Sequence, residues 1–182
     1  MFGHLILALS AIADAGDIYT IDNSHSSVVF RIMHQNISYT QGRFNKISGK
    51  LNLDEDTKKS SVQITIEASS IDTNNSMRDI HLRKSEFLDA KNYPEIAFES
   101  TSLEKLEGDV LQVNGNLTLH GIRKKISIEM RETGRGKDLW GGYRVGHSSN
   151  FTIKRSDFGI THMEKSIGDE VHLMISLESI KK

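Results

Sequence analysis

The residues of this chain that could do chemistry are eight histidines and a scatter of carboxylates and arginines. The histidines occupy positions 4, 25, 34, 81, 120, 147, 162 and 172, and none is spaced as H-x-H or H-x-x-x-H. The zinc motif HExxH and the G-x-S-x-G, P-loop and G-x-G-x-x-G patterns are also absent. The chain has no cysteine, which excludes disulfides and thiolate chemistry. The sequence therefore predicts no metal site, no resident cofactor and no standard catalytic centre.

One histidine nevertheless has the spacing of an interior residue. His34 shares strand parity with Phe30 and Ile32, so its side chain would point to the same apolar face. A neighbouring polar group could satisfy it there, or it could reach the head group of a ligand. We favour the first interpretation.

Three further polar residues have spacings that suggest positions near such an interior. Asp79 and His81 are two residues apart and cannot face one side of a helix, so we expect them to tie a helical segment to the rest of the fold. Arg155 lies two residues before Asp157. An ion pair between these two is as good an interpretation as contact between Arg155 and a phosphate or carbonyl group.

Runs of alternating apolar and polar residues dominate the chain. Eight such runs are predicted as half-buried antiparallel strands, at residues 27–34, 42–54, 61–68, 95–100, 109–121, 125–130, 143–155 and 170–179. In the second run Phe44 is out of phase with Ile47, so a bulge is expected near Lys46. The connectors are rich in glycine, aspartate and other charged residues, which is typical of turns.

Eight antiparallel strands on one short chain can close into a barrel and leave no exposed edge. A barrel of this size is either filled by its own side chains or holds one small ligand. The apolar residues expected inside are Phe30, Ile32, Phe44, Phe98, Leu117, Leu119, Phe151 and Ile153. Barrel physics alone leaves both possibilities open.

The segment 76–94 breaks the alternation and carries Pro94, the single proline of the chain. A helix is expected to begin near Ser76, because Asn74, Asn75 and Ser76 are all good N-caps and Ser76 to Asp79 resembles a capping box. Met77 and Ile80 are expected on its apolar underside. A second short turn follows with more apolar residues, and the proline ends the segment. We expect a helical lid across one end of the barrel.

Residues 1–15 differ from the rest, because an apolar run ends there in Ala13-Asp14-Ala15, the pattern of a signal-peptide cleavage site. The run is too short for a permanent membrane span. Residues 16–182 are then a single domain with 23 basic and 23 acidic residues, since Asp14 is the one charge removed from totals of 23 and 24. A neutral domain lacks the basic surface of a nucleic-acid binder.

The order of the motifs resembles that of the YceI-like proteins over nearly the whole of residues 16–182. The stretch "RDIHLRKSEFLDAKNYPEIAFES" resembles the family pattern RD-x-HL followed by YP-x-I-x-F-x-S. The stretches "YTIDNSHSSVVFRIMH", "GRFNKISGKLNLD", "VNGNLTLHGIRKKI" and "IKRSDFGI" are similar to the other family motifs. Ile122 stands where valine is commoner, which is a small departure.

The resemblance implies an extended lipocalin-like barrel of eight antiparallel strands, exported to the bacterial periplasm. It also implies that the interior binds a long isoprenoid or other amphiphilic lipid, such as a polyprenyl quinone or a polyprenyl phosphate derivative. The ligand contacts expected on this basis are the eight interior apolar residues together with His34, Asp79, His81 and Arg155.

Two alternatives to a lipid carrier without catalytic activity stay open at the level of sequence. One is an enzyme that modifies a lipid head group at the barrel mouth with Asp79, His81 and Arg155. The other is a filled barrel that acts through a protein partner. A homodimer is compatible with either.

Overall fold

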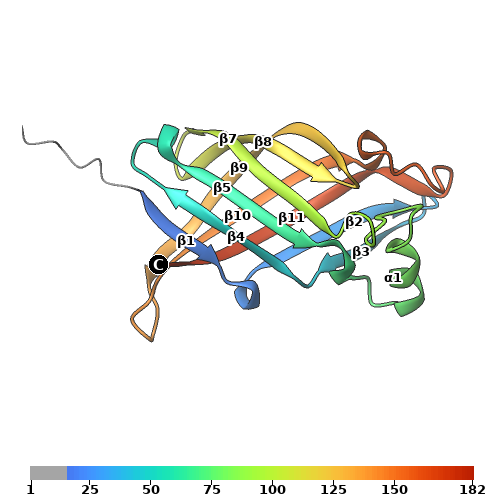
Figure 1. Cartoon of the computed structure of the whole chain (residues 1–182), viewed down its shortest axis with the longest axis horizontal. Helices are drawn as coiled ribbons and strands as arrows, with labels where there is room; N and C mark the ends of the chain where they lie inside the picture. Colours follow the sequence, from blue (N-terminus) through green and yellow to red (C-terminus); the bar gives the residue numbers. More distant parts are fainter. Residues whose placement is uncertain (1–15) are drawn as a thin grey trace, which may run out of the picture.

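The computed structural model describes residues 16–182, so the predicted leader at 1–15 lies outside the described residues. The strands are β1 (Asp17–Ile21), β2 (Ser27–His34), β3 (Ser38–Phe44), β4 (Ile47–Leu53), β5 (Ser61–Glu67), β6 (Ile71–Asp72), β7 (Glu95–Lys105), β8 (Val110–Leu119), β9 (Ile122–Lys137), β10 (Tyr143–Lys154) and β11 (Ile167–Lys181). Helix α1 is Ser76–Leu82, and the 3₁₀ turns are η1 (Asn23–His25), η2 (Thr57–Lys59), η3 (Ala68–Ser70) and η4 (Arg155–Phe158). Figure 1 shows the strands wrapped into one elongated barrel with α1 at one end.

These segments make eight long antiparallel strands, because β1 and β2, β3 and β4, and β5 and β6 are each one strand with an interruption. The barrel closes because β11 pairs with β1 near its end and with β2 along its first part. The expected fold class, an eight-stranded antiparallel barrel with a short helical lid, is confirmed. The short strands β1 and β6 were missed, and several strands are longer than predicted: β3 begins at Ser38, β7 continues to Lys105, and β9 extends to Lys137 through a polar stretch without alternation.

The interruption between β3 and β4 lies at Lys46, where the sequence predicted a bulge. Side chains there replace ladder bonds: the Lys46 N–H donates to Ser70 Oγ at 3.1 Å, and the Ile47 N–H donates to Asn23 Oδ1 at 2.7 Å. Phe44 and Ile47 on either side are both buried. The break therefore restores the inward phase of the strand, as a bulge would.

The half of the barrel near the chain's C-terminus is filled by its own side chains. Its most completely buried residues are Tyr19, Leu51, Val62, Leu103, Val113, Val145, His147 and Ser179. They come from the ends of the strands that face away from α1 (Figure 1). This half supplies a packed core that holds the register of the strands, which then continue toward the lid.

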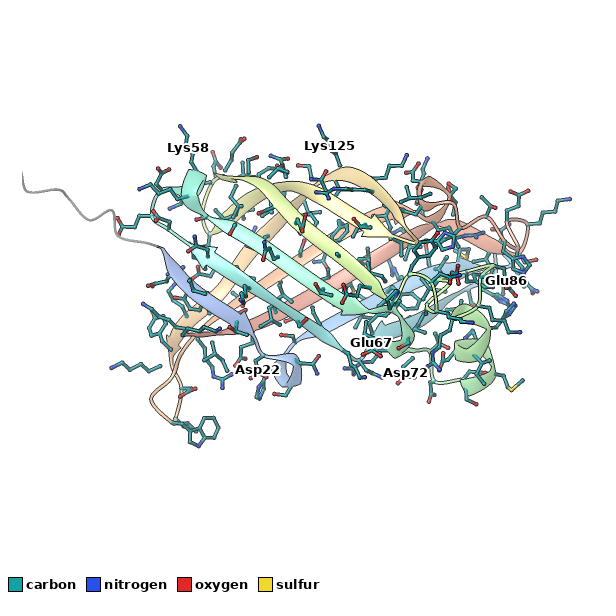
Figure 2. The ribbon with its side chains drawn as sticks, in the orientation of Figure 1. Asp22, Lys58, Glu67, Asp72, Glu86 and Lys125 are labelled. Atoms are coloured by element: carbon teal, nitrogen blue, oxygen red, sulfur yellow. The ribbon has the colours of Figure 1, made fainter. Side chains whose placement is uncertain are left out.

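The opposite end, called the lid end below, is formed by the β2–β3 turn, the segment from β6 to β7 that contains α1, the β8–β9 turn and the β10–β11 connection. Figure 2 places Glu86 at the lid end and Lys58 near the opposite end. Within residues 16–182, no helix is both long and apolar enough to cross a bilayer.

His147 on β10 is a polar residue inside the filled half, with a side chain only 1% exposed. Its Nδ1 has no hydrogen-bond partner among the described residues. Burial lowers the pKa of His147 from 6.5 to about 4, because the charged imidazolium cannot be solvated there.

We therefore expect acid to destabilise the barrel before its carboxylates titrate. Between pH 7 and pH 5 the unfolded chain takes up a proton at His147 and the folded chain does not. The unfolded state thus binds more protons, and the free energy of unfolding should fall by about 2 kcal/mol. Denaturant unfolding at the two pH values measures this loss. The His147→Gln protein should lose little stability between the two pH values. A protein with His34→Gln, a change at an exposed histidine, should lose as much as the unchanged chain. An equal loss of stability in the unchanged chain and both variants would show that His147 is not the group responsible.

Candidate functional site

A cavity of about 350 Å³ occupies the half of the barrel under the lid. Its wall is made of apolar side chains from β2, β3, β5 and β7 to β11, and its lid side is made by α1 and the segment after it. The predicted interior residues all line it: Phe30, Ile32, Phe44, Phe98, Leu117, Leu119, Phe151 and Ile153. Of the predicted polar residues, His34, His81 and Arg155 line it and Asp79 does not. The favoured interpretation of His34 as a buried residue satisfied by a neighbour is wrong, because His34 is exposed at the end of β2, at the rim of the cavity.

Two glycines keep the lumen open by giving aromatic rings a place against the wall. The ring of Phe30 lies over Gly42 on the neighbouring strand, where a Cβ would come within 2.4 Å of its Cζ. The ring of Phe98 lies over Gly115 in the same way, at 2.5 Å. A side chain at either position would push the ring into the lumen. Neither glycine was predicted from the sequence, although glycine inside a strand is a known sign of close approach.

The lid is anchored by Asp79, which is 7% exposed and points inward. Its Oδ1 accepts hydrogen bonds from the N–H of Thr73 at 2.9 Å and from Thr73 Oγ1 at 2.6 Å. Arg78 donates from Nε to Thr73 Oγ1 and from Nη2 to the Thr73 carbonyl. Asp79 thus ties the lid to the strand end beside it, as expected, but its carboxylate is engaged by the protein and does not reach the cavity.

This anchor also sets the rotation of α1 and corrects the predicted underside. Asn75, one of the three candidate N-caps, is the N-cap, since its side chain accepts from the Arg78 N–H. Met77 and Ile80 were expected to face the barrel, but they are 73% and 51% exposed. The lid residues that line the cavity are instead Arg78, His81, Leu82, Phe87 and Leu88.

Three rings form a cluster at the cavity mouth. His81 and His162 each meet Phe87 edge to face, at centroid distances of 5.0 and 5.1 Å, and they lie 5.9 Å from one another. His81 Nε2 is 3.4 Å from the Glu86 carboxylate. Phe87 is buried at 5% exposure. The cluster joins the lid to the β10–β11 connection.

Arg155 has a structural role in that connection. Its guanidinium donates to the backbone carbonyls of Gly168, Ile160, His162 and Ile167, at 2.8 to 3.1 Å. Of the two interpretations of Arg155, the ion pair with Asp157 is not observed, because these carbonyls engage the guanidinium instead. The side chain is 5% exposed and forms part of the cavity wall.

A cluster of Asp22, His25 and Glu178 has ligand atoms within 4.8 Å of one another, but it is a salt-bridge network. Arg144 Nη1 donates to Asp22 Oδ2 at 2.8 Å and to Glu178 Oε1 at 2.7 Å. Hydrogen bonds from Ser24, Arg144 and His25 hold the pKa of the Asp22 carboxyl well below its usual range. The guanidinium occupies the place that a cation would take.

The geometry of the cavity suits an amphiphile. Its deeper wall is apolar, and the polar groups that line it, among them His34, Thr73, Arg78 and His81, belong to the lid end. An apolar chain could lie along the strands while a polar group stays near the mouth.

The docking of the lid can be tested at Phe87. Phe87→Ala should lower the free energy of unfolding by about 3 kcal/mol, because a buried ring and its two aromatic contacts are lost. Met77→Ala on the outer face of α1 is the matched control and should change it by less than about 0.5 kcal/mol. Equal effects of the two changes, measured by denaturant unfolding, would contradict a docked lid.

The chain is similar to known proteins in both sequence and fold. Residues 19–179 match the model of the YceI-like domain. The protein YceI of Salmonella newport is 41% identical over 167 residues, which cover 90% of this chain and 87% of that protein. The crystal structure of the Campylobacter jejuni YCEI protein is similar, with 31% identity, a TM-score of 0.73, and coverage of 80% of this chain and 87% of that one. A polyisoprenoid binding domain from Saccharophagus degradans shares the fold at 17% identity, with a TM-score of 0.71 and coverage of 90% and 98%.

Proposed function

Because this chain belongs to the YceI-like family, we propose that it binds a long isoprenoid or similar amphiphilic lipid in the cavity under its lid and carries it unchanged. The observation that carries the proposal is the apolar cavity of about 350 Å³ whose polar lining groups belong to the lid end. The similar fold of a domain described as polyisoprenoid binding supports the choice of ligand class. A polyprenyl quinone and a polyprenyl phosphate derivative both fit this description.

Burial of the chain can supply the affinity without any charged contact. Each buried methylene contributes about 0.8 kcal/mol, so two or three isoprene units give micromolar binding after the cost of association. The wall residues that would bury the chain include Phe30, Phe98 and Leu117, and His34 and His81 would lie nearer its polar end.

Two observations favour a carrier over the alternatives. Asp79 and Arg155, which an enzyme would use on a head group, are each engaged by hydrogen bonds within the protein. A filled barrel acting through a protein partner would not need the cavity, nor the glycines that hold Phe30 and Phe98 against the wall.

The direct test of ligand class is organic extraction of the purified protein followed by mass spectrometry. A co-purified polyprenyl species is the expected result. An empty extract, from protein that also fails to bind added polyprenol, would favour the filled barrel.

Leu117→Phe tests whether the cavity is the binding site. Leu117 lines the cavity, so a larger ring should occupy open volume, reduce lipid binding and leave the delipidated protein about as stable as before. Val113→Phe on the same strand is the control, since Val113 is fully buried in the filled half and the larger side chain should cost roughly 1–3 kcal/mol. A fluorescent-lipid titration measures the lipid affinity of each variant, and denaturant unfolding measures its stability. A large stability loss with unchanged lipid affinity in Leu117→Phe would mean that a core had been mistaken for a site.

We propose the periplasm as the compartment, on the basis of the apolar run and the Ala13-Asp14-Ala15 pattern. Protein recovered from the periplasm should begin at Gly16, one residue before β1. N-terminal sequencing measures this, and soluble protein that keeps Met1 in the cytoplasm would refute it.

A further inference from the structure

Large apolar side chains are exposed around the lid end of the barrel. Ile37 in the β2–β3 turn is 79% exposed, Met77 and Ile80 on α1 are 73% and 51% exposed, and Met163 in the β10–β11 connection is 43% exposed. We call these four residues the apolar rim.

The segments that carry the rim are joined to one another. The Gln35 N–H donates to the Ser166 carbonyl at 2.7 Å, which ties the β2–β3 turn to the β10–β11 connection. The rings of His81 and His162 lie 5.9 Å apart and bring α1 to the same connection. Met163 belongs to the rim and also lines the cavity. The rim is therefore continuous with the apolar wall of the cavity.

The outer face of α1 combines apolar with basic residues. Arg78 on α1 and Lys84, two residues after its end, are exposed, and the guanidinium of Arg78 is bonded to Thr73. Asp79, the acidic residue of the helix, is turned inward and buried against Thr73. The exposed Met77 and Ile80 with the basic Lys84 nearby fit the interface of a bilayer that contains anionic phospholipid, and the exposed carboxylate of Glu164 beside Met163 is balanced by the neighbouring Lys165.

We infer that the apolar rim docks the lid end on the surface of a phospholipid bilayer, so that the ligand passes between membrane and cavity without crossing water. This inference rests on the proposed function, because a long isoprenoid resides in membranes and is insoluble outside them. It also gives a reason for the outward rotation of α1: Asp79 holds the polar side of the helix inward and leaves Met77 and Ile80 for the lipid.

The chain contains a matched control at its other end. Leu139 and Trp140 are 94% and 83% exposed at the tip of the β9–β10 hairpin, which Figure 1 shows projecting at the end away from α1. Asp138 Oδ1 accepts from the N–H groups of Trp140 and Gly142, which shape this tip as a turn. It offers two large apolar side chains that are remote from the cavity mouth.

The experiment is flotation of the full chain with vesicles of phosphatidylcholine and a minor fraction of phosphatidylglycerol. Met77→Gln/Ile80→Gln should weaken vesicle binding about tenfold, since two apolar side chains leave the interface while a good helix former replaces each. Leu139→Gln/Trp140→Gln should bind as the unchanged chain does. All variants are prepared with the same N-terminus, so the apolar run of residues 1–15, where it is retained, contributes equally to each. Lys84→Gln should make vesicle binding less sensitive to salt, because one basic group no longer attracts the anionic lipid.

Unchanged flotation of the Met77→Gln/Ile80→Gln protein would overturn the inference, as would a loss seen only in the Leu139→Gln/Trp140→Gln protein. Light scattering adds a second check: a dimer that dissociates in the Met77→Gln/Ile80→Gln protein, without a loss of flotation, would assign the rim to a second copy of the chain and overturn the inference as well.

Ligand measurements separate this inference from the proposed function. A fluorescent polyprenol analogue added from ethanol should bind the Met77→Gln/Ile80→Gln protein as tightly as the unchanged chain, while its transfer from vesicles slows about tenfold. Equal transfer rates in the two proteins would overturn docking through the rim. Failure of the unchanged chain to bind the analogue at all would refute the proposed function, and the flotation result would stand by itself.

Discussion

An eight-stranded barrel encloses about as much space as its own side chains need, and this limit governs the rest of the molecule. A cavity can exist in such a barrel only where side chains are kept out of the lumen. Here Phe30 and Phe98 lie flat against the wall over Gly42 and Gly115, and the space they leave becomes the cavity. The same strands are filled with side chains at the other end, where Leu51 and Val113 are completely buried. The same strands thus form the wall of the cavity at the lid end and a packed core at the other end.

The sequence predicted the strands well because alternation reports directly which face is buried. It placed Phe30, Leu117 and Ile153 correctly on the inner face. It did not decide between a core and a cavity, because that depends on how rings from one strand meet glycines on the next. The pairing of Phe30 with Gly42 follows from strand register, and a list of apolar positions does not contain it.

The lid was the element whose residues were least well assigned, for a physical reason. Helix α1 has seven residues, too few for its apolar pattern to fix its rotation. The buried hydrogen bonds of Asp79 with Thr73 fix it instead, because an unpaired buried carboxylate costs more than two exposed apolar side chains. The structural role of Arg155 was one of the two interpretations from the sequence, but its partners were not predicted, because they are backbone carbonyls, which leave no trace in the sequence.

The cost of the open half explains why the other half is packed so completely. A cavity of about 350 Å³ forgoes the packing contacts that a filled core would make, which costs stability when it is empty. Two features offset this loss when the cavity is empty: the filled half holds the strands, and Asp79 and Arg155 hold the lid and the β10–β11 connection by hydrogen bonds that need no ligand. The polar residues near the cavity that resemble catalytic groups are thus the ones that keep its mouth in shape. A ligand entering a site held open in this way gains the burial of its chain without also having to fold the protein around it.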